Sequence, residues 1–232
     1  VCARGGYGGN RVLPLLDYDA IARNPKIFVG YSDVTGYLTS IAQRAGLVTF
    51  HGPMLSTFGT RTEAYNLETL QRVLSGAADL RIDAAAACPA RTLRPGRARG
   101  TLWGGNLTLV VERLATAGQL DTRGAILLLE DVDEQLYAFE RMLLHLKRSG
   151  SLDGIQGLVV GEMLEMGDKE VPFGKDTDAI VLDVCADLDI PIIANFPCGH
   201  GECQATLPIG HEIELHADGE APFLRIPESP VS

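Results

Sequence analysis

Short apolar segments alternate along the chain with segments whose apolar residues recur at helical spacing. The run 125–129 is entirely apolar and too short to span a membrane, so it predicts a buried strand. The run 135–148 carries Leu136, Phe139, Leu143 and Leu146 on one face and is followed by Gly150, which predicts a helix. The same reasoning predicts strands at 1–3, 26–30, 47–50, 158–160 and 191–195, and helices at 33–44, 66–74, 106–114 and 178–188.

The end of the chain follows a different pattern. Between His211 and Ile226, apolar and polar residues alternate on both sides of Asp218-Gly219, which predicts a β-hairpin. Strands that alternate with helices before this hairpin indicate the α/β class.

Residues 77–99 lack a clear period and contain an alanine run, two prolines and a cluster of four arginines at positions 91, 94, 97 and 99. Such a stretch is typical of a linker or a functional loop. We therefore predict an N-terminal domain at 1–76, a linker at 77–99 and a C-terminal domain at 100–232. A solvated linker explains the four arginines better than an anion site does.

Composition and charge narrow the classes of protein that fit. The chain has 232 residues, of which 46% are hydrophobic and 22% charged, as in ordinary globular proteins. Its net charge of −10 argues against a nucleic-acid partner, and no apolar run approaches the ~20 residues of a membrane span. Residues 1–120 carry a net charge of +5 and residues 121–232 a net charge of −15, which also suggests two domains.

The first residues and the cysteines bear on the N-terminus of the protein and on its cellular compartment. The chain begins at Val1 with neither an initiator Met nor a signal peptide, so we expect its true N-terminus to lie further upstream. The five cysteines form no Cys-x-x-Cys pair, which suggests reduced thiols in a cytoplasm-like compartment. Neither that pair nor the Pro-Cys-x-x-Cys of zinc deaminases occurs, so we predict no metal site and no cofactor.

Candidate chemistry lies at the ends of the predicted strands, where open α/β sheets bind their ligands. Ser32 follows strand 26–30, Glu130 follows strand 125–129, and His200 follows strand 191–195. The order Ser, Glu, His is that of the α/β-hydrolase triad.

Each of these residues also has a plainer interpretation. A sharp strand-to-helix turn would expose the Ser32 hydroxyl at a helix N-terminus, but a serine there more often caps the helix, and position 34 is Val instead of the usual Gly. A carboxylate at the end of an apolar strand needs a partner, such as an imidazole N–H, although Glu130 could also be a surface acid. His200 lies between two glycines, but an isolated histidine is more often structural.

The glycine-rich turn at 4–9 lacks the third glycine of a dinucleotide fingerprint, because Arg11 stands in its place. Backbone N–H groups in such a turn suit an oxyanion hole, and we expect the N–H groups of Gly6 and Asp33 to form it. Trp103 and Asn106 follow a short strand and are candidate pocket residues. Trp103 could equally belong to the core, and Asn106 could equally be a helix cap. A Cys198–His200 pair is a weaker alternative nucleophile and base.

Six motifs in this order resemble those of the LD-carboxypeptidases, the muramoyltetrapeptide carboxypeptidases. They include Arg-Gly-Gly-Tyr-Gly at 4–8, Gly-Tyr-Ser-Asp at 30–33, Leu-Leu-Leu-Glu-Asp at 127–131 and Cys-Gly-His-Gly at 198–201. The others lie at 50–53 and 104–107, so the resemblance covers nearly the whole chain.

This resemblance implies a serine peptidase with Ser32 as nucleophile, His200 as general base and Glu130 orienting the imidazole. It implies a flavodoxin-like N-terminal half, whose first strands are missing here, and a C-terminal domain of mixed strands, with the active site between them. It further implies a cytoplasmic homodimer that releases the terminal D-alanine of murein tetrapeptides in peptidoglycan recycling. The alternatives are a hydrolase of microcin C-type peptide–nucleotides, an amidase or esterase of the same fold, and an inactive protein that binds cell-wall peptides.

Overall fold

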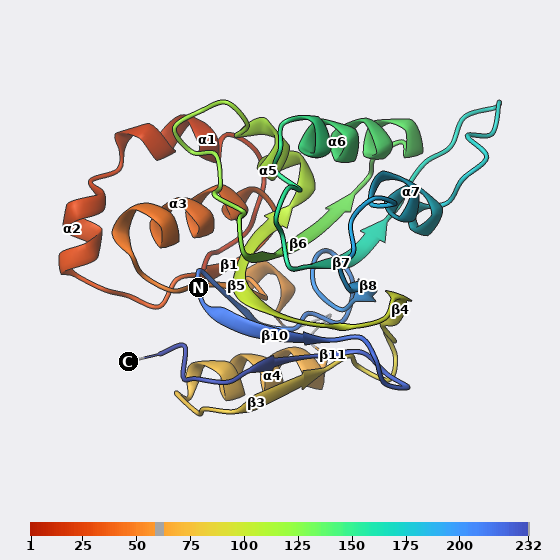
Figure 1. Cartoon of the computed structure of the whole chain (residues 1–232). Helices are drawn as coiled ribbons and strands as arrows, with labels where there is room; N and C mark the ends of the chain where they lie inside the picture. The colour runs from red at the N-terminus through yellow and green to blue at the C-terminus, as the bar shows by residue number, and fades with distance from the viewer. Residues whose placement is uncertain (59–62, 232) are drawn as a thin grey trace.

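Two β-sheets form the framework of the computed structural model, which describes residues 1–58 and 63–231 (Figure 1). The strands are β1 (Val29–Gly30), β2 (Thr49–His51), β3 (Leu80–Asp83), β4 (Arg91–Arg94), β5 (Arg97–Asn106), β6 (Ala125–Val132), β7 (Gly157–Leu164), β8 (Ile192–Phe196), β9 (Leu207–Ile209), β10 (Glu212–His216) and β11 (Phe223–Ile226). The larger sheet has the order β3-β11-β10-β5-β6-β7-β8-β4, and the smaller has the order β1-β2-β9. Parallel and antiparallel pairs occur in both, so the fold is mixed α/β.

Helices connect many of these strands. The α-helices are α1 (Gly9–Val12), α2 (Tyr18–Arg23), α3 (Thr35–Ala45), α4 (Ala64–Leu74), α5 (Leu107–Glu112), α6 (Leu136–Arg148) and α7 (Thr177–Val184), and the 3-10 helices are η1 (Leu13–Leu15), η2 (Ser32–Val34) and η3 (Leu55–Thr57). The predicted helices at 33–44, 66–74 and 135–148 are confirmed within a few residues, with the first turn after Ser32 wound as η2. None of the helices in the described part of the chain has the length and apolar character that crossing a bilayer requires.

Strand β6 lies inside the larger sheet, in parallel register with β5 and β7. Ile126 and Leu128 pack into one hydrophobic cluster, whereas Leu127 and Leu129 pack into another that includes residues of α5, α6 and α7. Because both faces of the strand are covered, its sequence is apolar without interruption until Glu130.

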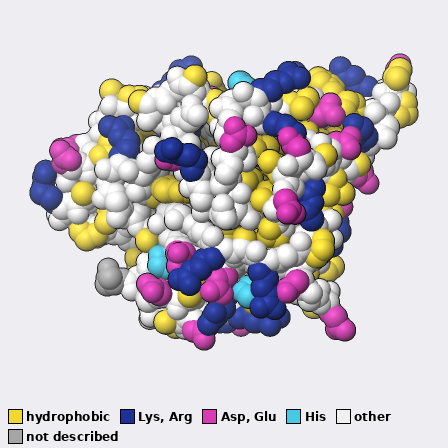
Figure 2. Space-filling model, in the orientation of Figure 1, with side chains coloured by type: hydrophobic (Ala, Val, Ile, Leu, Met, Phe, Trp, Pro, Cys, Tyr) yellow, Lys and Arg dark blue, Asp and Glu magenta, His cyan; other side chains and the backbone are white. Residues whose placement is uncertain are grey.

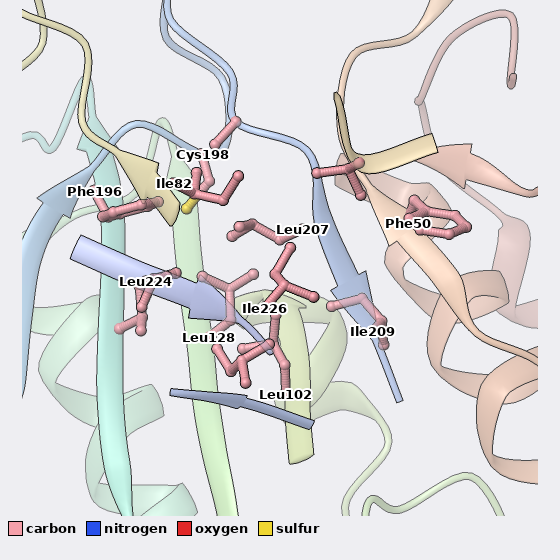
Figure 3. Close-up of a cluster of buried hydrophobic side chains, with 14 of the residues drawn as sticks. Phe50, Ile82, Leu102, Leu128, Phe196, Cys198, Leu207, Ile209, Leu224 and Ile226 are labelled. Carbon is pink, nitrogen blue, oxygen red and sulfur yellow. The ribbon is translucent and has the colours of Figure 1, made fainter. Parts of the chain in front are cut away.

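The first cluster joins the two sheets. Figure 3 shows side chains of the smaller sheet beside those of the larger one, including Phe50, Leu207 and Ile209 together with Leu102, Leu128 and Leu224. Burial of this apolar surface is the main force that holds the two sheets in a fixed relation. The strand ends that carry Ser32 and Glu130 are therefore placed by one shared core.

The segment 77–99 is no structureless linker. It contains β3 and β4 and the start of β5, and β3 pairs with β11 while β4 pairs with β8. In β3, Leu80 and Ile82 are buried while Arg81 and Asp83 are exposed. This alternation is that of a short strand, which the sequence analysis did not predict here. The domain boundary that we placed here stays a prediction.

The arginines of this segment bind groups of the protein itself. Arg91 Nε lies 2.6 Å from Asp178 Oδ2, Arg97 Nε lies 2.7 Å from Asp218 Oδ2, and Arg94 donates to the carbonyl of Cys185 at 3.0 Å. Figure 2 shows the resulting mixture of basic and acidic side chains over β10 and β11. These contacts favour a structural role over an anion site.

The N-terminal segment runs beside β1 without forming a regular strand. The N–H of Cys2 donates to the carbonyl of Val29 at 2.9 Å, and the N–H of Leu55 donates to the carbonyl of Cys2 at 3.0 Å. The strand predicted at 26–30 is regular only at Val29–Gly30. The glycine turn that follows Ala3 therefore begins at the same edge as Ser32.

Candidate active site

Ser32 lies at the sharp turn between β1 and η2. Its φ of +62° is uncommon for a residue other than glycine, and such backbone strain is concentrated at functional sites. A Cβ on Gly5 would lie 2.9 Å from Ser32 Oγ, so the glycine turn closes directly over the serine. A Cβ on Gly30 would lie 2.6 Å from Val34 Cγ1, so Gly30 provides the space that Val34 occupies. The turn thus forms although position 34 is not glycine.

His200 and Glu130 are hydrogen-bonded to each other. The distance from His200 Nδ1 to Glu130 Oε2 is 2.8 Å, and the Glu130 side chain is fully buried at the end of β6. Gly199 has a φ of +127°, and a Cβ there would lie 2.7 Å from Glu130 Oε2. Glycine before His200 therefore permits this approach. The ring of Tyr31 meets the His200 ring edge to face, with 5.0 Å between the centroids.

Burial and charge oppose each other at this pair. Burial lowers the pKa of His200, but the hydrogen bond and the negative charge of Glu130 outweigh it, so the pKa lies above its ordinary 6.5. Burial raises the pKa of the Glu130 carboxyl, and the hydrogen bond to His200 opposes that rise. Because Nδ1 faces Glu130, the Nε2 of His200 remains available to another group.

One cavity of about 430 Å³ brings the predicted residues together. Its lining includes Ser32, His200, Gly6, Asp33 and Asn106. The carboxylate of Asp33 accepts from the N–H of Gly9 at 2.9 Å, which ties the glycine turn to the start of η2. The nucleophile, base and oxyanion candidates thus share one cavity, although they come from opposite ends of the chain.

The two candidate pocket residues differ in placement. Asn106 lines the cavity and also caps α5, because its Oδ1 accepts from the N–H of Leu109 at 3.2 Å. The ring of Trp103 packs against both hydrophobic clusters and close to Gly210, and it is absent from the described lining of the Ser32 cavity. The structure therefore gives Trp103 a packing role.

The sequence did not reveal the part played by Asp131. Asp131 is buried and accepts from Asn106 Nδ2 at 2.9 Å and from the N–H of Thr108 at 3.0 Å. These bonds fix Asn106 beside the His200 partner Glu130. In the sequence, nothing distinguishes Asp131 at the end of the strand from the acidic residues Asp133 and Glu134 that follow it.

Two other groups, His51 and Cys198, are less suited to act as base or nucleophile. His51 is buried, and its two ring nitrogens have no hydrogen-bond partner; burial lowers its pKa to about 3. Burial also raises the pKa of the Cys198 thiol well above its ordinary value, which disfavours a thiolate nucleophile. Among residues 1–58 and 63–231, no group of three or more His, Cys, Asp or Glu side chains is placed to hold a metal ion.

Comparison with known proteins points to one family. Residues 1–52 match the LD-carboxypeptidase N-terminal domain, and residues 99–215 match the LD-carboxypeptidase C-terminal domain. The chain is 33% identical over 223 residues to the murein tetrapeptide carboxypeptidase of Pseudomonas aeruginosa, covering 94% of this chain and 72% of that protein.

Two solved structures share the fold. The muramoyltetrapeptide carboxypeptidase of Oxalobacter formigenes superposes with a TM-score of 0.87 at 33% identity, over 99% of this chain and 79% of that one. The microcin C7 self-immunity protein, known from Escherichia coli, superposes with a TM-score of 0.86 at 27% identity, over 99% of this chain and 76% of that one.

Proposed function

Because this chain belongs to the LD-carboxypeptidase family and is a serine-type carboxypeptidase, we propose that it releases the terminal D-alanine of murein tetrapeptides through Ser32, His200 and Glu130. The observation that carries the proposal is the 2.8 Å hydrogen bond from His200 Nδ1 to Glu130 Oε2, beside a serine held at positive φ in the same cavity. The names of the carboxypeptidase relatives support the choice of substrate.

The mechanism follows from the availability of His200 Nε2 to accept the proton of Ser32 Oγ. Nε2 of His200 takes the proton of Ser32 Oγ while that oxygen attacks the carbonyl carbon before D-alanine. The N–H groups of Gly6 and Asp33 stabilise the oxyanion. His200 then gives its proton to the leaving amine, the C–N bond breaks, and an acyl-enzyme remains. Water, deprotonated by His200, hydrolyses the ester and restores Ser32.

Glu130 holds the imidazole in the tautomer that this sequence of proton transfers needs. Its position inside the sheet keeps water away, so the carboxylate interacts with the imidazolium at low dielectric. The role is positioning and charge stabilisation, and the carboxyl does not itself take the Ser32 proton.

The setting of the reaction is also part of the proposal. We propose a cytoplasmic homodimer acting in peptidoglycan recycling, as the family resemblance implies. Similarity to the microcin C7 self-immunity protein favours one alternative, hydrolysis of a peptide–nucleotide by the same three residues. Offering both substrates to the protein separates the two activities.

Covalent labelling tests the nucleophile without a murein substrate. A fluorophosphonate should phosphonylate Ser32, since its Oγ displaces fluoride while His200 accepts the proton. His200→Ala should slow labelling by about a thousandfold because the base is lost. Mass spectrometry of the tryptic peptides locates the adduct, and Ser75→Ala, on the surface beyond α4, is the matched control. An adduct on a different serine would contradict the assignment.

A further inference from the structure

A second cavity, of about 640 Å³, adjoins His200 and differs in character from the one that holds Ser32. Its lining includes Tyr31, Glu162 at the end of β7, and Gln204 from the loop before β9. His200 lines both cavities, so the second cavity lies directly beside the one that holds Ser32.

Three carboxylates stand among the described residues that line the second cavity. Glu162, Glu165 and Glu202 line it, whereas no lysine or arginine appears among its described lining residues. The ion pairs found within residues 1–58 and 63–231 include none of these three carboxylates.

Acidic side chains that line the Ser32 cavity accept hydrogen bonds from other groups of the protein. Asp33 accepts from Gly9, Asp131 accepts from Asn106 and Thr108, and Glu112 accepts from Asn10. That cavity also contains Arg11. The carboxylates that a positively charged ligand could neutralise therefore line the second cavity, on the other side of His200.

Glu162 is buried, whereas the other two carboxylates of this cavity are exposed. Its side chain belongs to a residue only 6% exposed, and its Oε2 is buried with no hydrogen-bond partner. A Cβ on Gly201 would lie 2.0 Å from this oxygen, so glycine after His200 makes room for the carboxylate. The nearby Oε1 of Gln204 is a second buried acceptor without a partner. Leaving such acceptors unpaired is costly, and a cationic donor relieves the cost.

The electrostatics of Glu162 agree with a binding site for a cation. Burial raises the pKa of Glu162 to about 7, and the negative charges of Glu130 and Glu202 add to this rise, while the Gly201 N–H and His200 oppose it. A bound ammonium would favour the ionised carboxylate and form a charge-assisted hydrogen bond.

We propose that this cavity binds the side-chain ammonium of the residue whose carbonyl Ser32 attacks, with Glu162 as the specificity-determining carboxylate. The inference rests on the proposed function, because it assumes a peptide with an amino-bearing residue before the terminal D-alanine. It also fixes the direction of binding, with the terminal carboxylate in the Ser32 cavity that contains Arg11.

The test compares two tetrapeptides that differ only at the residue before D-alanine, which is L-lysine in one and L-norleucine in the other. The wild-type protein should prefer the lysine peptide by about 30-fold in kcat/KM, mainly through KM, as expected for one hydrogen bond to a charged group. In Glu162→Gln the preference should fall to about threefold. Glu220→Gln, exposed in the β10–β11 turn, is the matched control and should keep the full preference.

The ratio separates recognition from a structural effect. If Glu162→Gln lowers the turnover of both peptides equally, or if the wild type does not discriminate, the proposed subsite is wrong. If the wild type cleaves neither peptide, the proposed function fails instead. Calorimetry with Ser32→Ala then decides the subsite: tighter binding of the lysine peptide supports it, and equal binding overturns it.

Discussion

Ser32→Ala should reduce release of D-alanine from a murein tetrapeptide by about five orders of magnitude, because no other group can form the acyl-enzyme. The change removes one oxygen from a small side chain at an unchanged backbone, so the melting temperature should stay within a few degrees of that of the wild type. Liberated D-alanine, measured by an oxidase-coupled assay, gives the rate.

Ser75→Ala is the control for this measurement, since it removes a serine hydroxyl at the end of α4, outside the lining of the cavity. Turnover by Ser32→Ala within tenfold of the wild type, at equal folding, would show that Ser32 is not the nucleophile.

Glu130→Gln should lower kcat by about three to four orders of magnitude and shift the pH profile. His200 must be neutral to accept a proton, so activity falls as the pH drops through its pKa. Burial lowers that pKa and Glu130 raises it above 6.5, so the wild-type acidic limb lies above pH 6.5. Without the carboxylate the burial effect remains, and the acidic limb should move to lower pH.

The measurement is kcat/KM from pH 5 to 9 for both proteins, with circular dichroism as the check on folding. A purely structural effect of Glu130→Gln would lower the rate at every pH without moving the limb. An acidic limb at the same pH in both proteins would contradict the role of Glu130 as the partner that sets the charge of His200.

The central elements could be predicted because their burial leaves a clear pattern. An uninterrupted apolar run such as 125–129 is stable as a strand that is covered on both faces. The amphipathic run 135–148 is stable as a helix that packs its apolar face on such a sheet. The strand-end rule then selected Ser32, Glu130 and His200. In the structure Ser32 and His200 line one cavity, and Glu130 is hydrogen-bonded to His200.

Elements set by tertiary pairing were harder to predict. Strand β9 has only three residues and is fixed by antiparallel pairing with β2, a contact about 160 positions away along the sequence. The strands within 77–99 are similarly short and rich in arginine.

Glu162 illustrates a related limit at the level of one side chain. It follows Val160 and Gly161 in a strand, and the loop that carries Gly201, from another part of the chain, lies against its carboxylate. The sequence shows an acid at the end of an apolar run, which also describes a solvated strand end. Its unpaired state depends on neighbours that no local pattern identifies.

The most direct test of the proposed activity is mass spectrometry of a murein tetrapeptide after incubation with the wild-type protein. We expect a tripeptide and free D-alanine, with no other cleavage. An intact tetrapeptide, or products cut at any other bond, would contradict it.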